Sequence, residues 1–306
     1  MRETISNFLA ETALNNPDFY VLSGDHGYAL FDEIRKSTPK QFINVGVSEQ
    51  AMVGYAAGMI KQGLKVVIYG LSAFVPIRVI EFIKMDICYE SLPLIILGDG
   101  AGLVYSTLGP SHQSAEDIAC MRALPNINIF SPADKFEMSA SLNKALLLNS
   151  PSYIRIGKSD KPCVHSQNFH LPKNPGLLSI SESYINKNCI IATGSMVSTG
   201  INISKKLNLN IFSFTELSNF DEKIIVNQIS KYNNIFTIEE HSINGGMGSI
   251  ISEIIAENRL NINLKRIGIR NKFSQKCGSY EYLLKEHELD EISIYSHIAN
   301  FIENRG

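Results

Sequence analysis

One glutamate stands in a segment whose residue types favour proton chemistry. Residues 44–59 read NVGVSEQAMVGYAAGM, and Ser48 is well placed to cap a helix that begins at Glu49. A carboxylate in the first turn of a helix often serves only the helix dipole. Here the flanking residues are apolar and no basic residue lies nearby in the sequence. The carboxyl group of Glu49 can therefore share a proton with a bound molecule.

The pattern of strands and helices around Glu49 predicts an α/β fold. Short apolar strands alternate with helix-period segments, which favours two domains, each a mostly parallel sheet flanked by helices. In the first domain, residues 1–158, the predicted strands are Tyr20–Leu22, Val66–Tyr69, Leu94–Leu97, Ile127–Phe130 and Tyr153–Ile156. The predicted helices are Thr4–Asn15, Glu49–Gln62, Val79–Cys88, Ala115–Ala123 and Lys135–Asn149.

A polar, proline-containing stretch separates the two predicted domains. Residues 159–176 read SDKPCVHSQNFHLPKNPG, and we assign residues 159–183 to a linker. The alternation then resumes over residues 184–306, which form the second predicted domain. Its predicted strands are Cys189–Ala192, Ile211–Phe214 and Ile235–Ile238, and its predicted helices are Ser198–Leu207, Ile224–Ile229 and Met247–Asn258.

Composition and charge exclude several classes of protein. Of 306 residues, 44% are hydrophobic and 19% are charged, which is typical of a globular protein. A net charge of −2 without a basic run argues against a nucleic-acid or anionic-membrane partner. The five cysteines are scattered without a CxxC pair, which indicates reduced thiols in a cytoplasm, not a disulfide framework or a zinc site.

Neither an export signal nor a membrane span is expected. Arg2, Glu3 and Glu11 occupy the region where a signal peptide needs an apolar core. The longest apolar stretch, residues 66–83, is interrupted by a proline and by charged residues, so it cannot cross a bilayer.

Residues 44–59 resemble the segment that bears the catalytic glutamate of transketolases and of deoxyxylulose-phosphate synthase, which are thiamine-diphosphate enzymes. The resemblance implies that Glu49 hydrogen-bonds N1′ of the aminopyrimidine of this cofactor and favours its imino tautomer. The imino nitrogen then takes the proton from C2 of the thiazolium ring. Glu49 is thus predicted to be both catalytic and cofactor-binding.

The resemblance extends along nearly the whole chain. SAFVPIR at residues 72–78 is similar to the family's aromatic loop, which implies that Phe74 stacks on the pyrimidine; a plain core aromatic is the alternative. GPSHQS at 109–114 and EDIACMR at 116–122 imply that His112 is catalytic and contacts the donor substrate. A loop histidine after Gly-Pro is also often functional in its own right. Asp25, in the SGD turn at 23–25, is assigned to cofactor binding. EEHSINGGMGS at 239–249 resembles a structural turn of the family's C-terminal domain.

The resemblance covers only part of a full transketolase. The family holds Mg²⁺ and the cofactor's diphosphate with a GDG sequence followed by an asparagine. Gly98-Asp99-Gly100 and Asn126 match this pattern, but the alignment through GPSHQ places them inside the pyrimidine-binding domain. We therefore predict no metal ligand in this chain. A separate N-terminal subunit is expected to bind the diphosphate and to be the main binder of the Mg²⁺ ion. The two kinds of chain are expected to form a heterotetramer.

Departures from the family bear on the substrate. Leu108 replaces an aspartate that selects a substrate hydroxyl, and a leucine accepts no hydrogen bond. By resemblance, Arg2 and Arg155 bind the sugar phosphate, with a solvated surface charge as the alternative for both. The family's phosphate-binding serine and histidine correspond to Ala29 and Gly98. These changes predict an atypical sugar, such as a deoxygenated or nucleotide-linked one.

Three functions remain open at this stage. The first is a transketolase subunit that transfers a two-carbon ketol unit. The second is a pyruvate-decarboxylating carboligase or the β-type subunit of a 2-oxo-acid dehydrogenase. GPSHQ and EDIACMR favour a transketolase over the dehydrogenases, whereas pyruvate as the donor stays open. The third is a non-catalytic interface subunit. The joint presence of Glu49, Phe74 and His112 argues against it.

Overall fold

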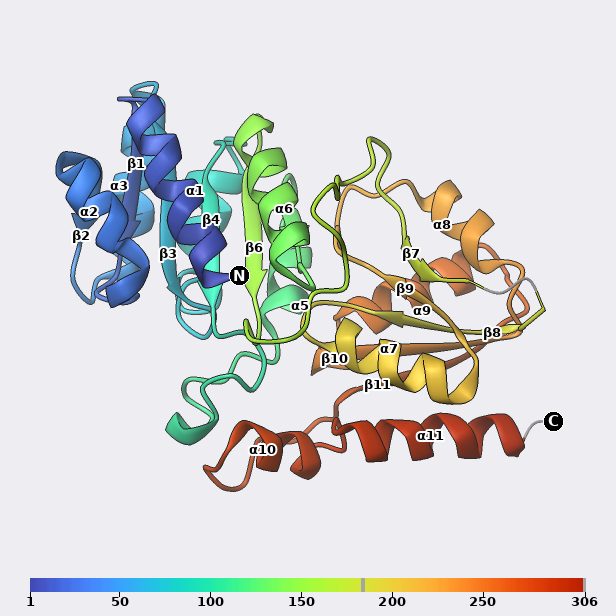
Figure 1. Ribbon diagram of the computed structural model, residues 1–306. Helices are drawn as coiled ribbons and strands as arrows, with labels where there is room; N and C mark the ends of the chain where they lie inside the picture. The colour runs from blue at the N-terminus through green and yellow to red at the C-terminus, as the bar shows by residue number, and fades with distance from the viewer. Residues whose placement is uncertain (183–184, 305–306) are drawn as a thin grey trace.

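The protein forms two α/β domains that lie side by side in a computed structural model, which describes residues 1–182 and 185–304 (Figure 1). The expected fold class, with a mostly parallel sheet in each domain, is confirmed. The boundary expected between residues 183 and 184 lies outside the described residues. Among the described residues, no helix is both long and apolar enough to span a bilayer.

The first domain is a six-stranded sheet in the order β2-β1-β3-β4-β6-β5, and every pairing is parallel. Its strands are β1 (Phe19–Ser23), β2 (Phe42–Asn44), β3 (Lys65–Leu71), β4 (Ile95–Asp99), β5 (Asn128–Phe130) and β6 (Ser152–Ile156). Its helices are α1 (Arg2–Asn15), α2 (Asp32–Ser37), α3 (Glu49–Lys61), α4 (Ile80–Phe82), α5 (Asp117–Arg122) and α6 (Lys135–Leu147).

The second domain is a five-stranded sheet in the order β11-β10-β8-β9-β7, in which only β7 is antiparallel to its neighbour among the described pairings. Its strands are β7 (Leu178–Ser181), β8 (Asn188–Ala192), β9 (Asn210–Ser213), β10 (Asn234–Ser242) and β11 (Asn263–Ile269). Its helices are α7 (Met196–Leu207), α8 (Glu222–Ile229), α9 (Met247–Glu257), α10 (Tyr280–Glu286) and α11 (Glu291–Glu303).

Several elements differ from the sequence-based expectations. β7 lies inside the stretch assigned to the linker. The helix expected at Val79–Cys88 is the short α4 followed by a wider π-helical segment at Ile83–Cys88. Strands β2 and β11 and helices α2, α10 and α11 had no predicted counterpart. β2 has three residues and is partly exposed, and much of β11 is only partly buried, so neither shows an apolar run.

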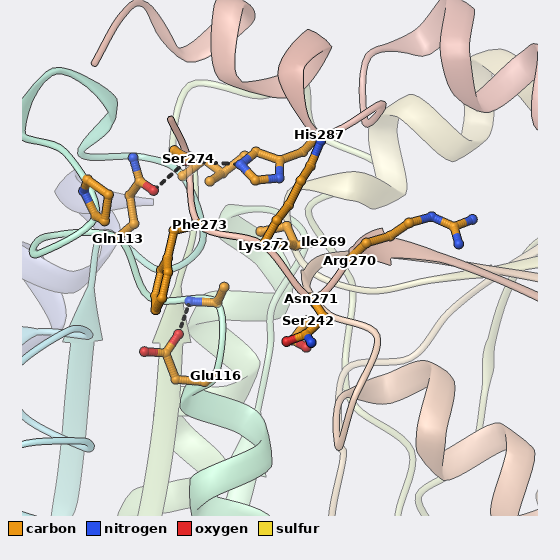
Figure 2. A pocket seen from close by; sticks show the side chains of 13 residues that line it. Gln113, Glu116, Ser242, Ile269, Arg270, Asn271, Lys272, Phe273, Ser274 and His287 are labelled. Atoms are coloured by element: carbon orange, nitrogen blue, oxygen red, sulfur yellow. Dashed lines mark hydrogen bonds between the residues drawn. The ribbon is translucent and has the colours of Figure 1, made fainter. Parts of the chain in front are cut away.

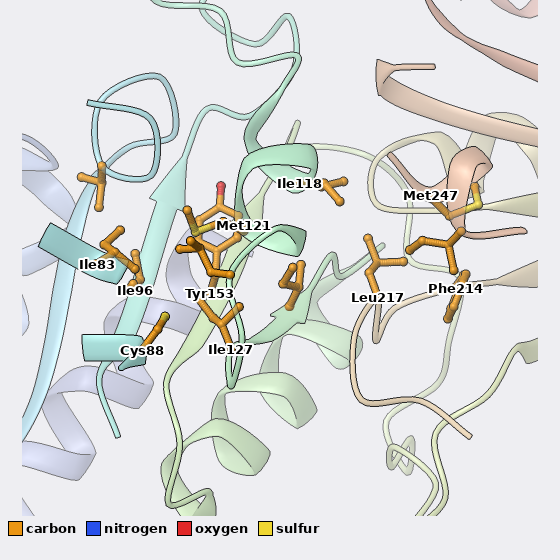
Figure 3. Close-up of a cluster of buried hydrophobic side chains, with 14 of the residues drawn as sticks. Ile83, Cys88, Ile96, Ile118, Met121, Ile127, Tyr153, Phe214, Leu217 and Met247 are labelled. Atoms are coloured by element: carbon orange, nitrogen blue, oxygen red, sulfur yellow. The ribbon is translucent and has the colours of Figure 1, made fainter. Parts of the chain in front are cut away.

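Alternate residues of the first sheet pack into two different hydrophobic layers. Val67 and Ile95 face α1 and α6, whereas Ile68 and Ile96 face α3 and the π-helical segment. The second of these layers continues into the second domain. Figure 3 shows Ile96, Met121 and Tyr153 of the first domain in one cluster with Phe214, Leu217 and Met247. The two domains therefore share part of their core.

A buried ion pair lies at the domain junction. Nε of Arg155, on β6, lies 2.8 Å from Oδ2 of Asp117, the first residue of α5, and their side chains are 2% and 0% exposed. The phenol of Tyr153 donates to the same carboxylate oxygen at 2.7 Å. Arg155 also donates to the carbonyl oxygen of Glu240, on β10 of the second domain, at 2.7 Å. One guanidinium thus joins three elements from two domains.

The carboxylate of Glu240, in the second domain, also contacts the first domain. It accepts hydrogen bonds from the backbone N–H of Leu103 at 2.7 Å, from Oγ of Ser195 at 2.8 Å and from the phenol of Tyr280. Leu103 belongs to the long loop after β4. The position of this loop therefore depends on how the two domains pack.

Removing one partner of this ion pair is expected to destabilise the protein strongly. Arg155→Met leaves the carboxylate of Asp117 buried without its cation, which should lower the free energy of unfolding by roughly 3–5 kcal/mol in urea titrations. The double variant Arg155→Met/Asp117→Leu should recover part of this loss, since no charge remains. As a control, Lys40→Met on the exposed surface should change stability by less than about 0.5 kcal/mol. Wild-type stability of Arg155→Met would contradict this account.

Candidate active site at the carboxyl edge of the first sheet

Loops with polar and aromatic side chains gather where the parallel strands of the first domain end. The turn after β1 carries Asp25, the loop after β3 carries Phe74, and the long loop after β4 carries His112. Helix α3 begins directly after β2, so Glu49 lies at the same edge. In open parallel sheets this edge is where ligands bind.

Glu49 is buried at the start of α3 and has a basic partner. Its side chain is 2% exposed, and its Oε1 lies 3.1 Å from Nη1 of Arg78. The expectation that no basic residue is near Glu49 was therefore wrong, because the partner comes from a loop 29 residues away. Ser48 occupies the N-cap position as expected, but its side chain makes no capping hydrogen bond.

Phe74 lies at the centre of an aromatic and cationic group. The guanidinium carbon of Arg78 lies 4.1 Å from the centre of its ring. The ring centroids of His112 and His26 lie 5.2 Å and 6.0 Å from it. Phe74 is only partly buried, which does not fit the plain core aromatic considered from the sequence. The structure thus brings Glu49 and Phe74 together through Arg78, and His112 joins them through its contact with Phe74.

His26 and Arg78 were not singled out from the sequence. His26 follows the SGD turn directly, and a histidine in a turn after a buried strand is a signal that could have found it. Asp25 itself is exposed, with a φ of 62°, and its Oδ1 accepts from the side-chain amide of Asn44 at 2.9 Å. It therefore ties the ends of two neighbouring strands together.

The loop after β4 carries two of the four substrate-binding candidates, Leu108 and His112. Leu108 ends a short 3-10 turn at Ser106–Leu108 and is 53% exposed. His112 lies in the turn that follows, partly buried, with its Nδ1 3.0 Å from Oγ of Ser111. Gly109, between them, has a φ of 81°, a conformation that favours glycine. A leucine at the exposed end of this loop offers no hydrogen bond to a substrate.

Asp99 is held by three donors at the end of β4. Its Oδ2 accepts from the phenols of Tyr69 at 2.5 Å and Tyr105 at 3.2 Å, and it lies 3.3 Å from Nη1 of Arg2. Burial first, and then the Asp99 carboxylate, raise the pKa of Tyr105 to about 12, so its hydroxyl remains a donor at neutral pH. Arg2 is half exposed, and its side chain is tied to this cluster.

Asp99 and Asn126 do not form a metal site together. Asp99 ends β4, whereas Asn126 precedes β5 at the opposite edge of the parallel sheet, with its side-chain amide donating to Cys88. The GDG…N pattern thus joins residues at opposite edges of the sheet. In the described part of the chain, no group of three or more His, Cys, Asp or Glu side chains could hold a metal ion.

Arg155 lies away from solvent. Its guanidinium is 2% exposed and bonded at the domain junction, so the surface-charge alternative was wrong for this residue. Its burial also leaves it unable to reach a sugar phosphate without opening the junction. An accessible cation after β6 is Lys158, whose side chain is 30% exposed and lies 3.1 Å from Asp160. The sequence did not distinguish these two cations, since burial depends on tertiary packing.

Comparison with known proteins identifies the family. Residues 1–162 match the transketolase pyrimidine-binding domain, and residues 185–294 match the transketolase C-terminal domain. The chain belongs to the transketolase family. It is 30% identical to a subunit of the apulose-4-phosphate transketolase of Actinobacillus succinogenes, over 85% of this chain and 84% of that protein. It is 34% identical to a putative transketolase C-terminal section of Methanocaldococcus jannaschii, over 90% of this chain and 87% of that protein.

Solved structures agree with this transketolase assignment. A protein described as a split gene transketolase, inactive β4 tetramer, matches with a TM-score of 0.87 and 28% identity over 98% of this chain and 97% of that chain. Transketolase from Campylobacter jejuni shares the fold with a TM-score of 0.80, and the chain spans 46% of its length. The protein is thus a transketolase-family subunit that corresponds to the pyrimidine-binding and C-terminal domains.

Proposed function

We propose that this chain is the pyrimidine-binding subunit of a split transketolase that transfers a two-carbon ketol unit between sugars. The single observation that carries the proposal is the group formed by the buried carboxyl of Glu49, the partly buried ring of Phe74 and His112, in which Arg78 contacts both Glu49 and Phe74, and His112 lies 5.2 Å from Phe74. A carboxyl group and the aromatic face that Arg78 now covers fit the hydrogen-bonding edge and the flat surface of an aminopyrimidine. Family membership implies dependence on thiamine diphosphate.

Each residue at the edge has a proposed role. Thiamine diphosphate, when bound, supplies the carbon nucleophile of the reaction. Glu49 would bind the ring nitrogen N1′ and hold the shared proton there, because its burial shields that hydrogen bond from water. Phe74 would carry the flat ring, and His112 would contact the donor. Asp25 would contribute to cofactor binding by holding the turn after β1, through its hydrogen bond with Asn44.

Arg78 contacts both residues that the aminopyrimidine would bind, Glu49 and Phe74. Its guanidinium pairs with Glu49 at 3.1 Å and covers Phe74 at 4.1 Å. It is a planar cation on a side chain that is 41% exposed, so it can move aside at a modest cost. We therefore propose that cofactor binding displaces Arg78.

A separate partner chain completes the proposed enzyme. Relatives of similar length are named as single subunits of transketolases, and the split transketolase of solved structure is described as an inactive tetramer. The partner would hold the diphosphate and Mg²⁺, and two copies of each chain would form a heterotetramer. The five free cysteines favour a reducing compartment such as the cytoplasm.

The proposed substrate is an atypical sugar. Relatives include a transketolase subunit for 6-deoxy-6-sulfo-D-fructose from Clostridium, 26% identical over 94% of this chain and 90% of that protein. Leu108 agrees with this, since it is exposed at the loop end and cannot bond a hydroxyl. Arg2 and Lys158 are the accessible cations for an anionic end of the sugar, whereas Arg155 is buried and is not part of the proposal.

Replacing the buried carboxyl should abolish most of the transferase activity. With the partner subunit, Mg²⁺ and thiamine diphosphate, Glu49→Gln should lower kcat by roughly 10²–10⁴-fold, as expected for a positioned proton-transfer group. Glu11→Gln, at an exposed position of helix α1, should leave the rate unchanged. An unaffected Glu49→Gln enzyme would favour a non-catalytic interface subunit. Release of carbon dioxide from pyruvate by the wild type would instead favour the decarboxylating function.

Removal of the competing guanidinium should tighten cofactor binding. Arg78→Ala should lower the Kd for thiamine diphosphate on the order of threefold to tenfold in calorimetric titrations of the assembled enzyme, because no protein group then has to leave Glu49 and Phe74. Arg35→Ala is a matched control, because Arg35 likewise covers an aromatic ring and pairs with a carboxylate, at 4.7 Å from the ring centre of Phe42 and 3.8 Å from Asp32. Weaker cofactor binding by Arg78→Ala would mean that Arg78 holds the ligand.

A carboxylate at the loop end should shift the choice of sugar. Leu108→Asp should raise kcat/KM for ordinary ketose phosphates, by roughly tenfold or more, because a substrate hydroxyl gains an acceptor. Leu147→Asp, at an exposed leucine on α6, should have no such effect. High wild-type activity on ordinary sugar phosphates, with no gain in the variant, would refute the role of Leu108.

A further inference from the structure

The loop after β4 is held at its base and near its end. The backbone groups of Gly102 and Ser114 bond each other in both directions, at 2.7 and 2.9 Å. Oε1 of Gln113 accepts a hydrogen bond from Oγ of Ser274, in the second domain, at 2.7 Å (Figure 2). Between these two supports, the 3-10 turn at Ser106–Leu108 lies beside α10 at the surface (Figure 1). The two supports leave the position of this turn open.

Tyr105 ties this turn to the first sheet. Its phenol donates to Oδ2 of Asp99, the last residue of β4, at 3.2 Å. Its carbonyl oxygen accepts from the backbone N–H of Leu108 at 3.1 Å, which closes the turn. The same carboxylate oxygen of Asp99 lies 3.3 Å from Nη1 of Arg2. One tyrosine thus links the exposed Leu108 to the end of a buried strand.

Gly100 leaves room for the ring of Tyr105. Its φ is 74°, and ring atoms of Tyr105 occupy the place that a Cβ atom on residue 100 would take. Any other residue at this position would therefore have to displace the ring. Gly63 has a similar φ of 89°, but no atom lies within 4 Å of the place of its Cβ. Gly100 thus serves the packing of Tyr105 in addition to the backbone conformation.

His112, in the same loop, has different supports. It is followed directly by Gln113, which is bonded to the second domain, and its ring lies 5.2 Å from that of Phe74. Leu108 is 53% exposed, and the closest support of its turn is Tyr105. A change at Tyr105 should therefore move Leu108 more than it moves His112.

We propose that Tyr105 is a positioning residue that sets where Leu108 meets the sugar, and thereby which sugar is bound. The inference rests on the proposed transferase function. Tyr105 acts through Leu108, since its own phenol is bonded to Asp99. Because Asp99 also holds Arg2, a cation proposed for the anionic end of the sugar, Tyr105 keeps Leu108 and Arg2 at a fixed spacing. The site would then select sugars in which the anionic end and the carbon that meets Leu108 have this spacing.

Hydrogen exchange of the full chain tests whether Tyr105 holds the turn. Tyr105→Ala and Gly100→Ala should each raise exchange in the peptide that contains Leu108 by roughly tenfold, because the turn opens more often. Gly63→Ala introduces the same kind of backbone strain with no ring to displace, so it should leave this peptide unchanged. The double variant Gly100→Ala/Tyr105→Ala should match Tyr105→Ala, since no ring remains to be displaced.

Steady-state kinetics of the assembled enzyme test the choice of sugar. The donor is 6-deoxy-6-sulfo-D-fructose or D-fructose 6-phosphate, whichever the wild type turns over. Tyr105→Ala and Gly100→Ala should raise KM roughly tenfold, as for the loss of part of one leucine contact, and change kcat by less than about threefold. Tyr105→Phe should raise KM less, because its ring still fills the space beside Gly100. A variant that had only lost stability would lower kcat at unchanged KM.

Two outcomes would overturn the proposal: equal exchange of the Leu108 peptide in Gly100→Ala and Gly63→Ala, or a fall in kcat at unchanged KM in Tyr105→Ala. A wild-type enzyme that turns over neither ketose would contradict the proposed function and with it the selection of the sugar. Hydrogen exchange would in that case still decide whether Tyr105 holds Leu108.

Discussion

The ion pair between Arg155 and Asp117 is the constraint on which the arrangement of this molecule depends. Two charges out of contact with water are tolerated only with good geometry and further hydrogen bonds. Here Tyr153 and the carbonyl oxygen of Glu240 supply those bonds, and Glu240 belongs to the other domain. The requirement to satisfy one guanidinium therefore fixes how the domains meet. Since Glu240 also binds Leu103, it fixes the base of the loop that carries His112.

The residues that the sequence identified, Glu49 and His112, each belong to a motif that is continuous in the sequence. Glu49 follows a helix cap, and His112 follows a Gly-Pro turn, so the motif and the position agree. Arg155 shows the limit of this reasoning. An arginine on an apolar strand looks the same whether it reaches a ligand or a buried carboxylate, and only the packing of α5 against β6 decides. Arg78 was missed for the same reason, since its partner Glu49 lies on another element.

The strands that were missed have a common physical cause. β2 is short and partly exposed, and β11 carries Lys265 and Arg266 within its apolar residues, so neither shows a buried run. The central strands β3, β4 and β8 are almost fully buried and were predicted. Burial thus determines how visible a strand is in the sequence, since the short edge strand β5, which is fully buried, was also predicted.

Strand β7 makes part of the segment that connects the domains a regular element of the second sheet. It pairs antiparallel with β9 and forms one edge of the second sheet, so part of the connection is itself a structural element. Upstream of it, His165 packs on Phe169 and binds Glu137, which is bonded to Ser213 and Thr215 of the second domain. A peptide bond hydrolysed between residues 170 and 175 would leave each sheet complete and the shared core intact. The two fragments should therefore stay associated, and this chain should tolerate a nick where a flexible tether would release its domains.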